Sequence, residues 1–579
     1  MILEIILNIA GIILLFLPGV LLSYIIFPKT DIIKRAGFSI VLGVSIAIIT
    51  SVLLFILNLF NVINVFLSLI FLSILFLLIM LNSDKEHETD FNKDIFYLIF
   101  FSLIGALWRI RFLSFASIFS DAYGYAGKFI GKEVPDLGFY TGMAVDHSNY
   151  AGTEIIKSIF TFISTNNYLS IFLITFVYLV FIYLIFCEFR DRKLAIVGVG
   201  LMSLGPIEIF HSTLLLIGPS LAYVNLFSLF LLFKLEDNKV FWISLLLSVS
   251  AIFTYYTSSM VMLLASVGFS VSLLIKELIK TKNIKKTFKN SLKNRKLFCF
   301  LLITLILFIH IYFLSDMIRF TKGTTKDFSN LPKVISSLKA ESTVYKDPTF
   351  LGLSAIRWQM LFFFLCGLTF IFHLIRKKDF SEENLGLILC LIPISIVSYG
   401  FLHVNLPTRI FDYFAFFGLL SLKIPKRWLK IFFILSFVFL FTTGVYVMKD
   451  KKIFFENSDG EIKAASWIKE NLNETVFSDQ KFINLVILKD YYNVTGTYDE
   501  DPLIKNLFYN NNLSTFLSSV KELNSNLSVD YIAITKRMQE KYVLMLNYPQ
   551  KQIQTTEFFE ENLEKVYGNG DVKIYKTKI

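Results

Sequence analysis

The chain has 579 residues, of which 55% are hydrophobic, 16% aromatic and only 17% charged, and its formal net charge is +11. This composition excludes an ordinary soluble protein and is typical of a polytopic membrane protein. The Lys and Arg residues are concentrated in short segments between apolar runs, where they orient helices in the membrane, so the positive charge does not indicate a nucleic-acid partner. The four cysteines lack the CxxC spacing of a zinc or redox site.

Apolar runs of about 17 to 25 residues recur as far as residue 448 and predict about fourteen transmembrane helices. Alternate connections carry the basic residues, and the positive-inside rule assigns these connections to the cytoplasm. They are 29–35, 85–93, 190–193, 234–239, 276–296, 376–378 and 423–430. The N-terminus, the intervening loops and the C-terminal segment are then predicted to be extracytoplasmic, in a multi-pass protein of the plasma membrane.

Four parts follow from this pattern. They are the N-terminal transmembrane helices at 1–112, an outer loop with an acidic motif and interfacial helices at 113–167, the remaining transmembrane helices at 168–448 with an outer loop at 317–351, and a soluble domain at 449–579. The fold class predicted here is a polytopic α-helical membrane protein with a small C-terminal α/β domain outside the cytoplasm.

Local signals in the C-terminal segment favour an α/β domain. Residues 461–471 have the pattern of an amphipathic helix, 529–535 that of a strand, and 565–575 that of a hairpin around an Asn-Gly turn. N-x-S/T sequons agree with an extracytoplasmic position, although an Asn-rich chain produces such triplets by chance. They begin at Asn473, Asn493, Asn512 and Asn526.

The outer loop at 113–167 contains the residues most suited to chemistry. Ser120-Asp121-Ala122-Tyr123 opens a polar stretch that continues to Asp146, His147 and Glu154. Polar loops of about this length inside compact architecture are usually functional. The alternative for Asp121 is an ordinary helix N-cap ahead of an interfacial helix.

Two arginines near the predicted outer ends of later spans are candidates for anion binding. Arg357 lies at the start of one span, and Arg409 lies near the outer end of another. A guanidinium suits bidentate binding of a lipid phosphate. The alternatives for Arg409 are snorkelling to the interface and an ion pair with Asp412.

This combination resembles the GT-C class of glycosyltransferases that use polyprenyl-phosphate-linked sugars. The first-loop Ser120-Asp121-Ala122-Tyr123 resembles the acidic motif of that class, Asp146-His147 its second acidic element, and Arg409 its lipid-phosphate contact. The class that the chain resembles includes protein O-mannosyltransferases, aminoarabinose transferases and oligosaccharyltransferases. The WWDYG element of oligosaccharyltransferases is absent, since 490–493 reads Asp-Tyr-Tyr-Asn, which disfavours transfer of a whole oligosaccharide to asparagine.

The resemblance implies transfer of a sugar from a polyprenyl-phosphate donor to a lipid, glycan or protein acceptor on the non-cytoplasmic face. Asp121 is then the catalytic base, and Tyr123, Asp146, His147, Arg357 and Arg409 are substrate-binding residues. Charge on the leaving phosphate is stabilised either by the arginines or by a divalent metal, Mg or Mn, held by Asp121, Asp146 and Glu154. The sequence does not decide between these two arrangements.

Two other classes share the many-span layout. A transporter or flippase of lipid-linked sugars would also have polar residues at membrane depth, but internally repeated halves are expected there, and the chain shows no clear repeat. The third hypothesis for the function is a non-catalytic subunit of an envelope assembly complex.

Overall fold

The computed structural model divides into two compact units. The described parts of the first unit lie within 1–112, 132–325 and 354–447, and those of the second within 350–353 and 448–577. Apart from isolated positions, the described residues are 2–57, 62–83, 86–110, 167–205, 256–283, 294–309, 350–377, 383–390, 424–455, 457–489, 493–496, 502–545 and 551–577.

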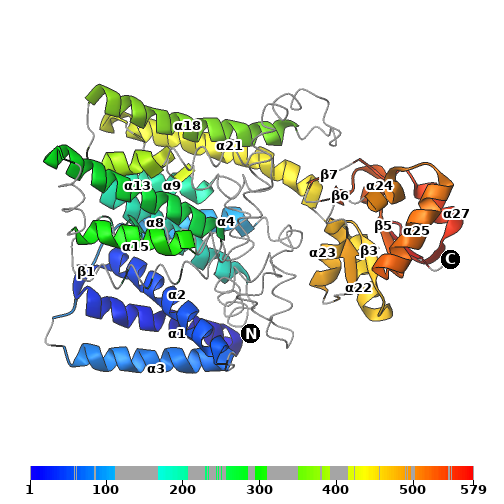
Figure 1. Ribbon diagram of the computed structural model, residues 1–579, viewed down its shortest axis with the longest axis horizontal. Helices are drawn as coiled ribbons and strands as arrows, with labels where there is room; N and C mark the ends of the chain where they lie inside the picture. Colours follow the sequence, from blue (N-terminus) through cyan, green and yellow to red (C-terminus); the bar gives the residue numbers. More distant parts are fainter. Residues whose placement is uncertain are drawn as a thin grey trace. The chain divides into compact units, whose positions relative to one another are not determined.

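The first unit is built from long apolar helices (Figure 1). A backbone in lipid must satisfy its N–H and C=O groups internally, and a helix does this within one segment. The helices are α1 (Ile2–Ile26), α2 (Ile32–Ile56), α3 (Val62–Leu81), α4 (Ile95–Ile110), α8 (Asn167–Phe189), α9 (Arg192–Leu204), α13 (Tyr256–Thr281), α15 (Arg295–Ile309), α18 (Phe350–Lys377) and α21 (Leu429–Phe455). Two short strands, β1 (Lys29–Asp31) and β2 (Glu88–Asp90), pair in parallel beside them.

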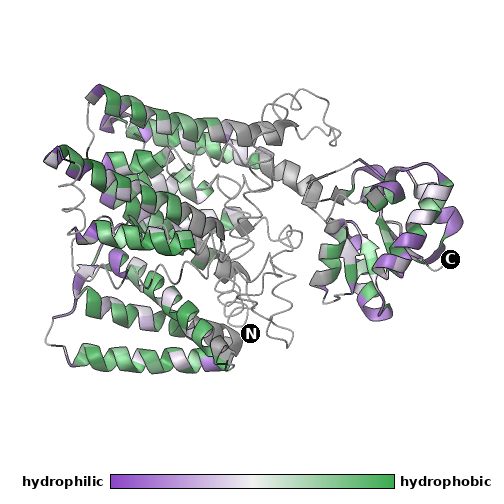
Figure 2. Cartoon of the chain, in the orientation of Figure 1, coloured by the Kyte–Doolittle hydropathy of each residue, from purple (hydrophilic) through white to green (hydrophobic). Residues whose placement is uncertain are grey.

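Among the described residues, four helical segments are long and apolar enough to cross a membrane. They are Ile32–Leu54, Ile63–Leu81, Met262–Thr281 and Lys426–Tyr446. Figure 2 shows the apolar character of the first unit's helices, with hydrophilic residues gathered mainly at their ends. The chain is therefore a helical membrane protein, and the total of about fourteen spans stays a prediction.

Small residues allow α1 and α2 to pack closely. A Cβ atom on Gly19 would lie 2.1 Å from the backbone oxygen of Ser39 and 2.3 Å from the backbone nitrogen of Gly43. The hydroxyls of Ser23 and Ser39 hydrogen-bond across the same contact at 3.1 Å. Close approach through small residues, with a hydroxyl pair between the helices, is the usual way that membrane helices associate.

The second unit is a mixed α/β domain whose central sheet has the order β4-β3-β5-β9-β8. Strands β4, β3 and β5 run parallel, whereas β9 is antiparallel to both β5 and β8. Its elements are α22 (Asp459–Asn471), β3 (Val476–Ser478), α23 (Gln480–Leu488), β4 (Val494–Gly496), α24 (Pro502–Tyr509), α25 (Leu513–Leu527), β5 (Tyr531–Thr535), α26 (Lys536–Glu540), β6 (Leu544–Met545), β7 (Tyr548–Pro549), α27 (Thr556–Asn562), β8 (Glu564–Gly568) and β9 (Val572–Lys576).

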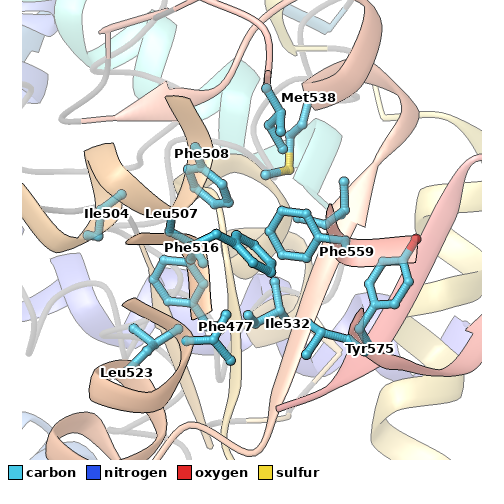
Figure 3. Packing of buried hydrophobic residues seen from close by; sticks show 14 of the residues in the cluster. Phe477, Ile504, Leu507, Phe508, Phe516, Leu523, Ile532, Met538, Phe559 and Tyr575 are labelled. Atoms are coloured by element: carbon cyan, nitrogen blue, oxygen red, sulfur yellow. The ribbon is translucent and has the colours of Figure 1, made fainter. Parts of the chain in front are cut away.

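A hydrophobic core lies on each face of this sheet. Alternation along β5 directs Ile532 and Ile534 into one core and Ala533 into the other. The first core, shown in Figure 3, receives Phe508 of α24, Phe516 of α25 and other aromatic residues. The second core contains Ala464, Ala465 and Ile468 of α22 together with α23 residues. The sheet is thus covered on both faces, as is usual where parallel strands form part of a sheet.

The three elements predicted for this segment are present. The predicted helix is α22, and Ser458 and Glu461 form a capping box at its N-terminus. The predicted strand is β5, and it begins at Tyr531 rather than at residue 529. The predicted hairpin is β8–β9, whose turn contains Gly570 at a φ of 88°, a conformation that glycine adopts without steric cost.

Candidate functional site

Most residues of the predicted catalytic site lie outside the described residues. The roles assigned to them therefore stay predictions. These residues are Asp121, Tyr123, Asp146, His147, Glu154 and Arg409. Within the described part of the chain, no group of three or more His, Cys, Asp or Glu side chains is arranged to hold a metal ion, and all three residues predicted as metal ligands belong to the part that is not described.

Arg357 is the one predicted site residue on a described element, since it belongs to helix α18. It precedes Leu361, Phe364 and Leu368 by four, seven and eleven positions, which is the spacing of one helical stripe. All three of these residues are exposed, whereas Gln359 is fully buried. The role of Arg357 in binding a phosphate stays a prediction.

The buried stripe of α18 is bonded to α21. The Gln359 Nε2 donates to Thr443 Oγ1 at 2.8 Å, and Thr443 Oγ1 donates to the carbonyl oxygen of Phe439 at 2.8 Å. Phe362 contacts the ring of Phe439 with centroids 5.5 Å apart. These contacts fix the two helices against each other in the part of α18 that carries Arg357.

Ion pairs join three of the basic connections at one end of the first unit's helices. Lys34 Nζ lies 2.5 Å from Glu188 Oε1, which links the start of α2 to the end of α8. Asp94, fully buried ahead of α4, accepts two hydrogen bonds from Arg192 of α9 at 2.5 and 2.6 Å and one from the hydroxyl of Tyr183. Three of the seven connections predicted to share the cytoplasmic face, 29–35, 85–93 and 190–193, thus lie near one another, and which face that end occupies stays a prediction.

Buried guanidinium groups also bond backbone carbonyls at this end. Arg35, 5% exposed, donates to the carbonyl oxygens of Ser23, Phe27, Pro28 and Glu88 at 2.6 to 3.1 Å. These oxygens belong to the last turn of α1, to the two residues that follow this helix, and to the first residue of β2. The guanidinium group has five N–H donors in a fixed planar arrangement, so one arginine can bond several backbone carbonyl groups at once.

In the second unit, the strand order brings the carboxyl ends of β3 and β5 side by side. The chain leaves β3 for β4 on one side and later returns to β5 on the other side. In open α/β sheets, ligands bind at the carboxyl edge where two such connections diverge. Asp479 directly follows β3, and Arg537 lies in the short helix α26 directly after β5.

Asp479 and Arg537 form a buried bidentate ion pair. The two terminal guanidinium nitrogens of Arg537 donate to Asp479 Oδ2 at 2.7 Å and Oδ1 at 2.8 Å. The side chain of Arg537 is 9% exposed, and that of Asp479 is fully buried. Asp479 Oδ1 also accepts the backbone N–H of Phe482 at 3.1 Å and so caps α23. Arg537 also donates to the carbonyl oxygen of Tyr542 at 3.1 Å.

Glu461 and Lys481 complete this buried ionic cluster, defined here as Glu461, Asp479, Lys481 and Arg537. Glu461 Oε1 lies 3.6 Å from Arg537 Nε, while Glu461 Oε2 accepts the backbone N–H of Ser458 at 2.9 Å. Lys481, the second residue of α23, is 0% exposed. Charged side chains are rarely buried to this extent unless they are paired.

The environment of the cluster changes the pKa of both of its basic residues. Burial lowers the pKa of Arg537, but the Asp479 carboxylate outweighs this effect and raises that pKa above its ordinary value. Burial, with a second contribution from the Arg537 charge, lowers the pKa of Lys481 to about 7, against the opposing attraction of Glu461 and Asp479.

The four members of the cluster were not singled out from the sequence. Glu461 carried one signal, because Ser-x-x-Glu ahead of an apolar run predicts a capping box. The other three residues are separated by up to 58 positions, and no local pattern reports that β3 and β5 are neighbours. Because Glu461, Asp479 and Arg537 are buried and paired with one another, they occupy the carboxyl edge themselves rather than present it to a substrate.

No protein-family model and no curated protein matches the chain. Among solved structures, it is similar to the oligosaccharyltransferase of Archaeoglobus fulgidus tethered to an acceptor peptide containing the NVT sequon, with 10% identity, a TM-score of 0.49 and coverage of 77% of this chain and 70% of that one. The same enzyme in complex with Zn and sulfate gives 10% identity, a TM-score of 0.46 and coverage of 76% and 68%. Likeness at this level does not establish a shared activity, so the function proposed below rests on the chain's own residues.

Proposed function

We propose that this membrane protein is a GT-C-type glycosyltransferase that moves a sugar from a polyprenyl-phosphate-linked donor to an acceptor on the non-cytoplasmic face. The observation that carries the proposal is the Ser120-Asp121-Ala122-Tyr123 motif, which stands in a long polar loop between apolar segments of a chain built from membrane helices. The acidic pair Asp146-His147 in the same loop, and Arg409 near the end of a later span, supply the other groups that such a reaction requires.

The proposed chemistry needs one base and one anion-binding group. The Asp121 carboxylate accepts the proton of an acceptor hydroxyl or amine, and the freed lone pair attacks the anomeric carbon of the sugar. The bond between that carbon and the phosphate oxygen breaks, so that the polyprenyl phosphate leaves with the electron pair. Arg409 and Arg357 stabilise the charge that develops on this phosphate.

Arg357 belongs to the apolar helix α18. A guanidinium suits the binding of a phosphate that arrives from the membrane. A divalent metal held by Asp121, Asp146 and Glu154 would supply the same charge stabilisation, and loss of activity in EDTA that Mg or Mn restores would assign it that role.

The test is transfer of a radiolabelled sugar from a polyprenyl-phosphate donor by the purified full-length chain. We expect Asp121→Asn to reduce the rate constant kcat by about 100- to 10,000-fold, the usual contribution of general base catalysis. Arg409→Gln should mainly raise KM for the donor. Full activity of Asp121→Asn would remove the catalytic assignment, and movement of the donor across a vesicle membrane without bond cleavage would favour a transporter.

A further inference from the structure

The connection between helices α13 and α15 carries most of the positive charge of the chain. Residues 276–296 contain nine Lys or Arg residues and a single acidic residue, Glu277, a net charge of +8, whereas the whole chain has +11. The next most basic of the connections predicted to be cytoplasmic, 423–430, has four basic residues and no acidic one. A few basic residues are enough to orient a span, so orientation alone does not account for this charge.

Helices α13 and α15 are antiparallel neighbours (Figure 1). The hydroxyls of Ser266 on α13 and Thr304 on α15 lie 2.9 Å apart. Phe269, three residues later on α13, contacts the ring of Phe300, four residues earlier on α15, with centroids 5.5 Å apart. Because the contacts advance along one helix as they recede along the other, the end of α13 and the start of α15 lie on the same side of the pair.

Four lysines meet at this end of the helix pair and are called the basic end here. They are Lys276, Lys280 and Lys282 at the end of α13 and Lys296 at the start of α15. The apolar span Met262–Thr281 ends between Lys280 and Lys282. Both of these lysines are exposed and neither forms an ion pair with a described residue. Since the apolar part of a span matches the hydrocarbon core, their ammonium groups are at the depth of lipid headgroups.

Exposed apolar side chains accompany the lysines of the basic end. Leu278 and Ile279, in the last turns of α13, are 39% and 67% exposed, and Phe298 near the start of α15 is 48% exposed. Apolar side chains exposed on a membrane span are in contact with acyl chains. Lysine stems can lie along such a surface while the ammonium group stays among the headgroups. A ligand that fits both features has an anionic head and apolar tails.

We propose that the basic end of α13 and α15 is a binding surface for anionic membrane lipids. The ammonium groups of Lys280 and Lys282 bind the lipid phosphate, and Leu278 and Ile279 contact its acyl chains. Clusters of four to eight basic residues beside a membrane helix are attracted to anionic lipid in this way. This inference goes beyond the proposed glycosyltransferase activity and does not depend on it.

Fluorescence quenching by brominated lipids tests the surface locally. The reporter is Ile279→Trp in the full-length chain in phosphatidylcholine vesicles, and the unmodified chain supplies the signal of the five native tryptophans. Brominated phosphatidylglycerol should quench the reporter more strongly than brominated phosphatidylcholine with the same acyl chains. Lys280→Gln with Lys282→Gln should lower the binding constant of phosphatidylglycerol by roughly 5- to 25-fold, since each lysine contributes roughly fivefold. The binding constant of phosphatidylcholine should stay within about twofold.

Two further variants separate the surface from the total charge of the chain. Lys280→Arg with Lys282→Arg keeps both charges and should keep the preference for phosphatidylglycerol. Lys426→Gln with Lys430→Gln removes the same charge at exposed positions of another basic connection, and it should leave quenching of the reporter unchanged.

Three results would overturn the inference. They are equal quenching by the two lipids, a glutamine double variant at positions 280 and 282 that keeps the preference, and a loss of preference as large in the control at positions 426 and 430. Reversal of the quenching by glycerol phosphate would also overturn it, because the surface would then bind a soluble phosphate rather than a lipid.

Discussion

Replacing Arg537 with methionine removes the cation that holds the carboxyl edge of the second unit together. Methionine keeps an unbranched apolar side chain but cannot donate to Asp479, which now accepts two hydrogen bonds from Arg537 at 2.7 and 2.8 Å. The hydrogen bond to the carbonyl oxygen of Tyr542 at 3.1 Å is lost as well. The carboxyl group of Asp479 would lose both of these donors in a site where it is fully buried.

The expected cost is large because one charge stays buried after its partner is removed. Breaking a buried ion pair in this way typically costs about 3–5 kcal/mol, whereas replacing both partners is often neutral. We therefore expect Arg537→Met to lower the free energy of unfolding of the second unit by about 3–5 kcal/mol. The double variant Asp479→Asn with Arg537→Met should recover most of this loss, since asparagine still caps α23.

Urea-dependent hydrogen exchange at β3 and β5 in the full-length protein measures these free energies. The neighbouring residue supplies the control, because Lys536 is 54% exposed and lies 3.8 Å from Glu540 in a surface pair. Lys536→Met should change the free energy by less than about 1 kcal/mol. An Arg537→Met variant as stable as this control, or a double variant no more stable than the single one, would refute the reasoning.

Two predictions concern helix packing in the first unit. Gly19→Leu should separate α1 from α2, because even a Cβ atom there would lie 2.1 Å from the backbone oxygen of Ser39; a marked fall in the melting temperature of the purified protein is the expected result, and an unchanged value contradicts the packing. Gln359→Leu should leave stability within about 1 kcal/mol, because the lost bond to Thr443 is offset by removal of a buried Oε1 that has no partner among the described residues. A leucine variant destabilised as much as Gln359→Ala would show that this oxygen is bonded.

Local signals were sufficient for the elements that are long or sharply bounded. The amphipathic period predicts α22, and the Asn-Gly turn predicts the β8–β9 hairpin. Strands β3 and β4 have only three residues each, too few for a period to be read. Their parallel pairing depends on contacts across long connections, which no local pattern encodes.

The candidate site shows the same division between local and long-range information. The helical register that places position 357 on one stripe with Leu361 and Phe364 can be counted from the sequence. The exposure of Leu361 and Phe364, however, depends on which helices cover α18. The buried ionic cluster is a stronger case, because Asp479 and Arg537 become neighbours only through the strand order β4-β3-β5. In the sequence, each is an ordinary charged residue in a polar segment.

The basic residues of the first unit have two roles that experiments on orientation must separate. The positive-inside rule uses the charge of a connection, but Arg35 is 5% exposed and bonds four carbonyl oxygens, and Arg192 binds the buried Asp94. Removing either arginine would destabilise the fold and would obscure any change of topology.

Two lysines suit a test of orientation better. Lys193 is at an exposed position, and Lys29 contacts exposed carboxylates, so both contribute to the same charge with weaker structural consequences. Substitutions at these two lysines, read out by the accessibility of added cysteines, therefore test the orientation without testing the fold.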